Sequence, residues 1–234
     1  MNEVYSSSGK IYNGEKAIIS LTSWKARINT VSKTLYSLLD KCPGFHIVLV
    51  LSEEEFPQKE KELPENLILF VENNLIELLW VYKNYKSFKK VLFTMDKYRD
   101  IPVISADDDC IYTCNYAELL YNEWEKRKDT RISLQCSKRF NLTLLGGCSV
   151  INPPNCFKDF DLSLLDKMRK YNEDDMLYSI LSFKYKIKQK SLNVKINNFI
   201  VFSNEIKPLN KTRKYDNKSD YFPLKKIIYA EFNR

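Results

Sequence analysis

Apolar runs alternate with amphipathic segments along the first half of the chain, and this alternation predicts its secondary structure. The run Ala17–Thr22 ends in small hydroxyl side chains, which is typical of a buried parallel strand that leads into a turn. Apolar residues recur at helical spacing over Val31–Leu39, and the segment Cys42–Gly44, with its proline and glycine, ends that helix. Phe45–Leu51 is predicted as the second strand.

A charged segment, Glu53–Glu65, is broken by two prolines and precedes two further predicted strands, Asn66–Val71 and Ile76–Val81. The apolar stripe over Tyr85–Tyr98 predicts a helix that leads into a strand at Ile101–Ala106. Strands that alternate with helices in this way form a mainly parallel sheet with helices on its faces.

The second half of the chain carries fewer periodic segments. They predict helices at Asn115–Lys126, Leu162–Met168 and Glu173–Phe183, the last capped by Asn172, and strands at Ile132–Cys136 and Cys148–Ile151 with a loop between them. Residues after Leu192 are left unassigned. A chain of 234 residues with 44% apolar side chains and this pattern fits a single α/β domain with a packed core.

Net charge narrows the class of ligand. The chain has 37 Lys and Arg against 30 Asp and Glu, a formal charge of +7 that favours a polyanion, an anionic membrane surface or a phosphorylated ligand. Basic residues are interspersed with acidic ones, as on an ordinary solvated surface, except in two richer stretches, Lys184–Lys195 and Lys207–Lys226. These two basic stretches are the candidates for membrane contact.

The six cysteines lack the paired short spacings of a zinc ribbon, and His46 is the only histidine, so the sequence argues against a zinc site. Cys110 and Cys114 are predicted to be reduced, partly buried thiols, which fits a cytoplasmic protein. The segment Met1–Lys16 is polar and does not resemble a secretory signal, and no apolar run approaches the roughly 20 residues that span a bilayer. The expected location is the cytoplasm, and any contact with the membrane is expected to be peripheral, at the inner face of the membrane.

The strongest chemical signal is the segment Val103–Asp109, in which an apolar strand runs directly into three aspartates. The carboxyl ends of parallel strands line the ligand crevice of an α/β sheet. Adjacent carboxylates repel one another, so this placement favours a hard divalent cation, Mn²⁺ or Mg²⁺, which also binds phosphate oxygens. The alternative is that the triplet is only a solvated turn or the cap of a helix.

A strand that ends in Asp-x-Asp resembles the signature of glycosyltransferases with the nucleotide-sugar-binding, Rossmann-like GT-A fold, and other segments resemble a bacterial, family 2-like group of these enzymes. The similar segments follow the same order and are ISLTSWKARI (19–28), LSEEEFP (51–57), YKSFKK (85–90), GGCSVINPP (146–154) and EDDML (173–177). The resemblance covers residues 17 to about 188 and implies a single GT-A domain. Its nucleotide-sugar-binding half would be 17–112, and 113–234 would be the acceptor-binding half with its basic tail.

The resemblance also implies roles for individual residues. The residues expected to lie near the nucleotide, diphosphate or sugar of the donor are Thr22, Arg27, Lys89, Lys90, Asp107 and Asp108, with one of the two lysines facing the site. Asp109, with Asp107, would hold the metal, and Asp175 or Asp174 would be the catalytic base of an inverting transfer to an acceptor hydroxyl. Helix capping alone also explains Asp174 and Asp175, and Gly146 and Gly147 fit either a close approach to substrate or a plain turn.

The implied substrates are a nucleotide-diphosphate sugar, with UDP-sugar favoured, and a glycan or lipid-linked glycan acceptor of a bacterial surface polysaccharide. The chain departs from the pattern at Asn152, where an aromatic residue is usual, and at Met176 and Leu177, which replace Ile and Trp. These positions are expected to shape the acceptor pocket, so the resemblance does not imply which acceptor of this class is used.

Two other classes of protein are compatible with parts of the sequence. A metal-dependent nucleotidyltransferase or phosphohydrolase also holds divalent ions with clustered carboxylates at strand ends, but the chain lacks a glycine-rich phosphate loop and a Walker-type lysine motif. A nucleic-acid-binding module would explain the positive charge and the many aromatic residues. We do not expect nucleic-acid binding, because most aromatic residues lie at core-like spacing and three carboxylates would repel phosphate.

Overall fold

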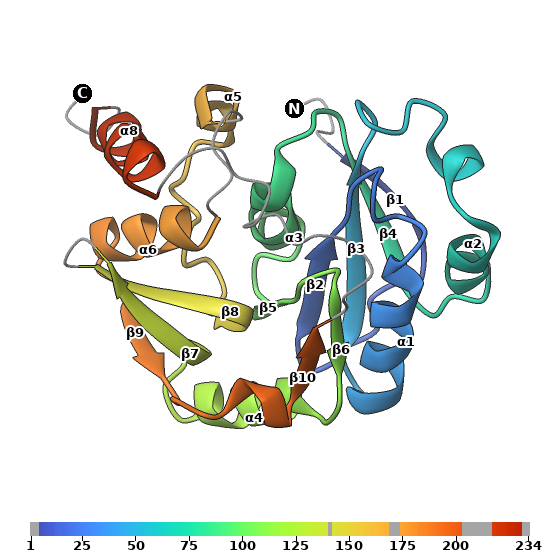
Figure 1. Ribbon diagram of the computed structural model, residues 1–234, viewed down its shortest axis with the longest axis horizontal. Coiled ribbons are helices and arrows are strands. Elements are labelled where there is room, and N and C mark those ends of the chain that lie inside the picture. The colour runs from blue at the N-terminus through green and yellow to red at the C-terminus, as the bar shows by residue number, and fades with distance from the viewer. Residues whose placement is uncertain (1–4, 140–141, 169–173, 203–216, 231–234) are drawn as a thin grey trace.

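The computed structural model describes residues 5–139, 142–168, 174–202 and 217–230 (Figure 1). The strands are β1 (Tyr5–Gly9), β2 (Ile18–Thr22), β3 (His46–Ser52), β4 (Glu77–Val81), β5 (Val103–Ser105), β6 (Cys110–Tyr112), β7 (Thr130–Arg139), β8 (Leu142–Asn152), β9 (Lys188–Ser191) and β10 (Ile200–Phe202). The α-helices are α1 (Val31–Lys41), α2 (Glu65–Glu72), α3 (Lys89–Lys97), α4 (Tyr116–Glu125), α5 (Leu165–Met168), α6 (Asp174–Lys184) and α8 (Asn217–Ala230). Short 3₁₀ turns lie at Lys59–Glu62, Lys86–Phe88, Leu162–Leu164 and Ile196–Asn198.

One eight-stranded sheet, in the order β1-β4-β3-β2-β5-β8-β7-β9, forms the centre of the molecule. Strands β4, β3, β2 and β5 are parallel, β1 and β8 flank them in antiparallel orientation, and β7 continues antiparallel to β8 and parallel to β9. A separate two-stranded sheet pairs β6 with β10. The expected α/β architecture with a mainly parallel sheet is confirmed.

Helices cover both faces of the sheet, as predicted, because successive residues of a strand point to opposite faces. Ile19 and Ile47 belong to a buried cluster with side chains of α1, α2 and α4, whereas their neighbours Ile18 and Val48 belong to a second cluster with α3, α5, α6 and α8. The four central parallel strands are therefore buried on both sides, which explains their nearly continuous apolar sequences.

Several predicted elements need correction. Residues 66–71, predicted as a strand, lie in helix α2, where Leu67, Phe70 and Val71 are buried at helical spacing. Pro64 precedes that helix with φ −60°, an angle that suits the start of a helix. The short apolar run imitates a strand because periodicity alone cannot separate a short helix from a short strand.

A second correction concerns the connection between the predicted strands 132–136 and 148–151. No loop covers Gly146 and Gly147; both glycines lie inside β8, which pairs with β7 along a long hairpin with a register shift between Ser133 and Gln135. Four short strands, β1, β6, β9 and β10, were not predicted. They are three to five residues long, and β1 and β9 consist largely of polar residues. The predicted cap Asn172 lies outside the described residues. Among the described helices, none has the length and apolarity needed to cross a membrane.

A buried polar cluster closes the amino ends of the parallel strands. Glu77, at the start of β4, is 2% exposed and accepts hydrogen bonds from His46 Nε2 at 2.7 Å, from Lys97 Nζ at 2.5 Å and from the Tyr98 hydroxyl. Burial acts to raise the pKa of Glu77, but these donors outweigh burial and leave the pKa below its ordinary value. The cluster lies at the edge of the sheet opposite to the aspartate triplet.

The pKa of Glu77 predicts how stability depends on pH. A carboxyl group with a lowered folded pKa contributes its full stabilisation above its ordinary pKa of 4.5 and loses it as pH falls through the lower folded value. We expect Glu77→Gln to lower the free energy of unfolding at pH 7 by about 3–5 kcal/mol, because it leaves buried donors without their anion. In urea unfolding from pH 7 to pH 3, the difference between wild type and variant should shrink with falling pH; a difference that does not depend on pH would contradict this assignment.

Candidate functional site

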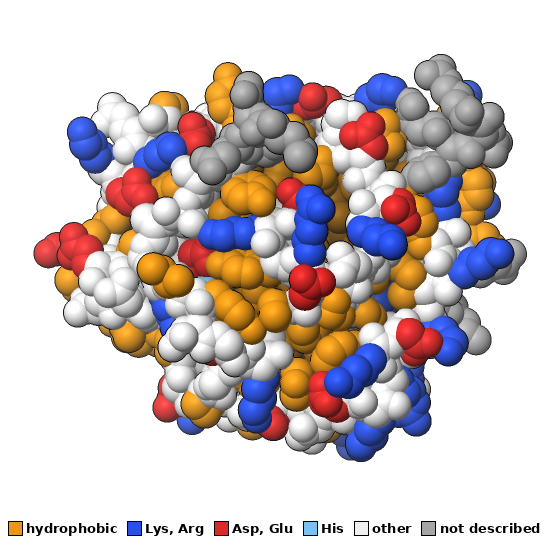
Figure 2. Space-filling model, turned by 180° about the vertical axis from the view of Figure 1, so that it is seen from behind, with side chains coloured by type: hydrophobic (Ala, Val, Ile, Leu, Met, Phe, Trp, Pro, Cys, Tyr) orange, Lys and Arg blue, Asp and Glu red, His pale blue; other side chains and the backbone are white. Residues whose placement is uncertain are grey.

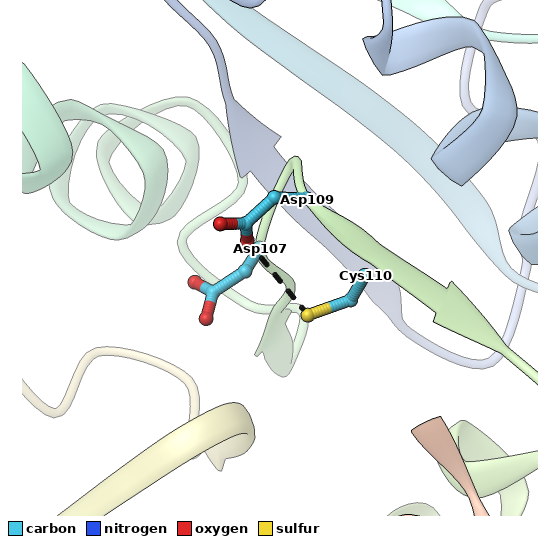
Figure 3. A group of neighbouring side chains, drawn as sticks. All are labelled: Asp107, Asp109 and Cys110. Carbon is cyan, nitrogen blue, oxygen red and sulfur yellow. Dashed lines mark hydrogen bonds between the residues drawn. The ribbon is translucent and has the colours of Figure 1, made fainter. Parts of the chain in front are cut away.

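The aspartate triplet lies where the parallel sheet ends. Asp107, Asp108 and Asp109 connect β5 to β6, at the carboxyl end of the strand that neighbours β2 (Figure 3). Asp108 is buried, whereas the side chains of Asp107 and Asp109 are 35% and 20% exposed. The Tyr112 hydroxyl accepts a hydrogen bond from the Asp107 amide at 3.1 Å. The triplet is therefore a fixed turn with two accessible carboxylates, and not a freely solvated one.

Arg27 anchors the middle and last carboxylates of the triplet. Its Nη1 lies 2.6 Å from Asp108 Oδ1 and 3.1 Å from Asp109 Oδ2. The other oxygen of Asp108 accepts from the Ser23 hydroxyl at 2.7 Å, and the Asp108 carbonyl accepts from Thr34 at 2.9 Å. Both carboxylate oxygens of Asp108 are thus bonded inside the protein.

Burial sets the pKa values around this anchor. Desolvation raises the pKa of Asp108 despite the opposing effect of Arg27, and it raises the pKa of Asp109 together with the neighbouring Asp107 charge. Burial acts to lower the pKa of Arg27, but Asp108 and Asp109 outweigh burial and raise it. Arg27 is therefore a permanent cation beside the triplet, and only part of the carboxylate charge is offset by it.

Lys90 joins the triplet to a helix that lies far away in the sequence. It lies in α3 and is 7% exposed, and its ammonium is 2.9 Å from Asp107 Oδ1 and 2.9 Å from Asp174 Oδ2 at the start of α6. Although burial acts to lower the pKa of Lys90, Asp107 and Asp174 raise it well above its ordinary value. The folded chain thus brings together three residues that the sequence placed in separate motifs.

Lys89 points elsewhere. Its ammonium donates to the Lys86 carbonyl at 3.1 Å and lies 3.8 Å from Glu55 Oε2, and the residue is 1% exposed. Burial lowers the pKa of Lys89 to about 8, and Glu55 partly opposes this shift. Neither lysine is the solvated side of an amphipathic helix, and of the two it is Lys90 that contacts the triplet.

The two candidate bases open α6. Burial, together with the charge of Asp174, raises the pKa of Asp175 well above its ordinary value, while Lys90 and Arg131 act in the opposite direction. Asp174 is held by Lys90 as described above. Thr22, the last residue of β2, is half-buried at the same end of the sheet, and its hydroxyl donates to the Val50 carbonyl at 2.6 Å.

Arg131 is a buried cation that sequence reasoning missed. It is 1% exposed, and among the described residues it donates hydrogen bonds to neutral acceptors: Asn152 Oδ1 at 2.8 Å, the Tyr178 carbonyl at 3.1 Å and the Ser182 hydroxyl at 2.7 Å. Its guanidinium also lies 5.4 Å from the ring of Phe157. The apolar environment of a strand gives no sequence signal for such a residue, because its partners come from α6 and β8.

The positions that were expected to shape an acceptor pocket lie in the core. Asn152 is fully buried, and its amide nitrogen donates to the Val103 and Val150 carbonyls while its oxygen accepts from Arg131. Met176 and Leu177 are also fully buried. The Asn152 side chain therefore supports the buried guanidinium of Arg131 and does not line an open pocket.

The structure brings together a group of side chains that could hold a metal ion. One ligand atom each from Asp107, Asp109 and Cys110 lies within 4.8 Å of the others (Figure 3). The two carboxylates each give one oxygen to a buried cation, Lys90 or Arg27, and Asp109 Oδ1 lies 3.9 Å from the Cys110 sulfur. Carboxylate oxygens suit Mg²⁺ and Mn²⁺, whereas a cysteine sulfur suits softer ions, so the fit to Mn²⁺ or Mg²⁺ rests on the two aspartates. These residues fit the expected divalent cation; Cys110 was not foreseen, although it directly follows the triplet.

Comparison with models of known families and with curated proteins gives no match for this chain. Solved structures do match: the glycosyltransferase GlyE of Streptococcus pneumoniae TIGR4 has a TM-score of 0.53 and 14% identity over 94% of this chain and 64% of that chain. S. aureus TarS 1–349 in complex with UDP-GlcNAc has a TM-score of 0.60 and 12% identity over 92% of this chain and 66% of that chain. The chain thus spans about two thirds of the length of each, and similarity at this level of identity establishes a shared fold.

The Arg131 environment yields a stability prediction. Asn152→Leu keeps the volume but removes the oxygen that accepts from a buried guanidinium, and we expect the free energy of unfolding to fall by about 2–3 kcal/mol. The matched variant Asn152→Asp keeps the acceptor for Arg131 but places a carboxylate oxygen against the Val103 and Val150 carbonyls, so its stability at pH 7 should lie between those of Asn152→Leu and wild type. Urea unfolding measures both; equal stability of Asn152→Leu and wild type would show that Asn152 does not support Arg131.

Proposed function

We propose that this chain is a metal-dependent glycosyltransferase that moves a sugar from a nucleotide-diphosphate donor, a UDP-sugar in the first place, to an acceptor hydroxyl. One observation carries the proposal: accessible carboxylates of Asp107 and Asp109 lie together at the carboxyl end of β5. The fold around them is similar to that of the glycosyltransferase GlyE and to that of TarS, which was crystallised with UDP-GlcNAc. Ligands of open α/β sheets bind at this edge.

The charges around the triplet support a divalent cation. Five carboxyl groups, those of Asp107, Asp108, Asp109, Asp174 and Asp175, lie around this site. Within the described residues the cations that contact them directly are Arg27 and Lys90, while Lys89 and Arg131 act on two of them from farther away. In our proposal Asp109 is the principal metal ligand and Asp107 the second, with Cys110 beside them. A bound Mn²⁺ or Mg²⁺ would neutralise the diphosphate as it leaves.

The chain's own residues divide into donor and acceptor groups. We assign Lys90, Arg27 and Thr22 to the donor side, and Asp108 to holding the turn through Arg27 and Ser23. Lys89, which faces Glu55, would act on the donor through its charge alone. This division corresponds to a donor-binding half at 17–112 and an acceptor-binding half at 113–234.

The transfer itself would be a single displacement with inversion. The acceptor hydroxyl is a poor nucleophile at neutral pH, and a positioned carboxylate that takes its proton contributes roughly 10²- to 10⁴-fold in rate. Asp175 suits this role because it opens α6 beside Asp174 and burial raises its pKa above the ordinary value, which makes its carboxylate a stronger base. Lys90 holds the neighbouring Asp174 and so fixes the start of α6 against the donor side.

A nucleotidyltransferase or phosphohydrolase would use the same carboxylates, and the products separate it from our proposal. A glycosyltransferase releases nucleoside diphosphate from a nucleotide sugar, whereas a nucleotidyltransferase acting in reverse consumes pyrophosphate. Nucleic-acid binding is not supported, because basic and acidic side chains are interspersed over the face shown in Figure 2. For the cellular role we propose synthesis of a bacterial surface polysaccharide on a glycan or lipid-linked glycan acceptor, at the cytoplasmic side of the membrane.

The metal assignment predicts a ligand-induced change in stability. A donor that binds only the folded state at 100 times its Kd stabilises the fold by about 2.7 kcal/mol. We expect UDP-sugar with Mn²⁺ to raise the melting temperature of wild type, and EDTA or Asp109→Asn to abolish this rise. The exposed Asp159→Asn is the matched control. A rise that persists in Asp109→Asn with EDTA present would refute the metal site.

The assignment of the base predicts a separation of catalysis from binding. Asp175→Asn should lower turnover by roughly 10²- to 10⁴-fold and leave the metal-dependent rise in melting temperature nearly intact, since the substitution keeps size and removes basicity. Because burial raises the pKa of Asp175 and the ionised form is the base, kcat/KM of wild type should increase with pH through that pKa.

If Asp174 and Asp175 serve only to cap α6, both Asp→Asn variants will keep almost full turnover, because Asn caps a helix nearly as well as Asp. An α-linked donor should give a β-linked product, which nuclear magnetic resonance of the product measures. A product with retained configuration, or near-normal turnover in both variants, would exclude Asp174 and Asp175 as the base.

A further inference from the structure

The end of α6 and the outer side of α8 form one exposed patch of aromatic and basic side chains. Phe183 and Phe222 are 67% and 62% exposed, although phenylalanine is ordinarily buried. Lys184 Nζ and Lys225 Nζ lie 5.8 Å and 5.7 Å from the ring centroid of Tyr229, so the two helices meet at that ring. We name these residues, with the exposed Lys226, the α6–α8 patch.

The arrangement along α8 explains why this side faces outward. Leu224 and Ile228 are fully buried and dock the helix on the second core cluster, in which α6 also takes part. Phe222, Lys225, Lys226 and Tyr229 follow the spacing i, i+3, i+4 and i+7, which places them on a common side of a helix. The sequence of α8 contains one acidic residue, Asp220, against three lysines.

The two basic stretches identified in the sequence contribute unequally to this surface. Lys188 and Lys190 of the first stretch pair with Asp129 and Glu123 at 2.6 Å and 3.0 Å, beside β7 and α4. Lys184, from the same stretch, instead meets Lys225 of the second stretch across Tyr229. Residues 203–216, which hold the rest of the second stretch, lie outside the described residues. The fold thus gathers on one surface cations that are 41 positions apart in the sequence.

We propose that the α6–α8 patch docks on an anionic lipid bilayer, with Phe183 and Phe222 inserted at the level of the headgroups and Lys184, Lys225 and Lys226 against the lipid phosphates. Aromatic side chains with neighbouring lysines are the pattern by which a helix lies in the membrane interface. Each lysine near an anionic surface raises the affinity about fivefold. A second copy of the chain would bring the lysines of two patches together, and like charges repel.

Helix α6 connects the α6–α8 patch with the candidate site. Helix α6 begins at Asp174 and ends at Lys184, a length of about 16 Å. Docking through the end of α6 would therefore hold the acceptor side of the proposed enzyme within reach of a lipid-linked acceptor. This last step depends on the proposed function, whereas the docking itself does not.

The test measures sedimentation of the purified full chain with vesicles, in the absence of metal and nucleotide. Vesicles of equal parts phosphatidylglycerol and phosphatidylcholine should bind wild type, and pure phosphatidylcholine vesicles should not. We expect Phe183→Ser/Phe222→Ser, and separately Lys184→Gln/Lys225→Gln/Lys226→Gln, to weaken binding at least tenfold. The control Leu69→Ser/Leu75→Ser removes apolar side chains that are 51% and 43% exposed near α2, on the other side of the molecule (Figure 1), and should bind like wild type.

Circular dichroism and thermal unfolding establish that each variant is folded, which exposed positions should permit. Absence of binding by wild type, or undiminished binding by either patch variant, would overturn the proposal. Equal binding to vesicles with and without phosphatidylglycerol would show that the lysines do not contribute to docking. Self-association that the phenylalanine variant abolishes would assign the patch to a second copy. If the donor raises the melting temperature but the protein does not bind vesicles, the membrane-docking proposal is wrong and the proposed transferase function still stands.

Discussion

The candidate site depends on one buried cation, the Lys90 ammonium, which lies between Asp107 at the end of β5 and Asp174 at the start of α6. Moving such charges out of water costs several kcal/mol for each ion. The attraction between them offsets this cost only where their geometry is closely held. The geometry is held here because the Lys90 carbonyl accepts from Ser20 of β2 and, at 3.1 Å, from Thr94. If helix α6 moved away from the donor edge of the sheet, Lys90 would keep Asp107 but lose its second anion, and this contact couples the two proposed halves of the enzyme.

A second constraint follows from the first. Arg27 and Ser23 bind both carboxylate oxygens of Asp108 and make it a structural anchor, whereas the side chains of Asp107 and Asp109 stay partly exposed. The remaining negative charge is what a divalent cation and a diphosphate together would balance. Arg131 adds a distant positive charge behind Asp175, and Asn152, Tyr178 and Ser182 hold it there.

Much of this arrangement could be predicted from the sequence, and the limits have physical causes. The parallel strands were predicted because burial on both faces makes them continuously apolar, and the triplet was noticed because three carboxylates at a strand end are costly without a partner. Residues 66–71 were assigned wrongly because a short apolar run fits a strand as well as a helix. Lys90 was predicted to be near the donor, but its contact with Asp174 was not, since 84 positions separate the two residues. Arg131 was not predicted because its partners are defined only by the packing of β7, β8 and α6. Cys110 was predicted only as a reduced thiol, and the turn after β5 places it beside Asp109.

In our proposal Asp107 and Asp109 form a metal site in which the donor diphosphate binds. It is tested most directly by anomalous diffraction at the manganese edge from a crystal grown with MnCl₂ and UDP. We expect one anomalous peak that lies within about 2.2 Å of a carboxylate oxygen of Asp107 and of one of Asp109, and that also contacts the diphosphate. UDP bound at this edge of the sheet with no manganese peak, or a peak bound to other residues, would contradict it.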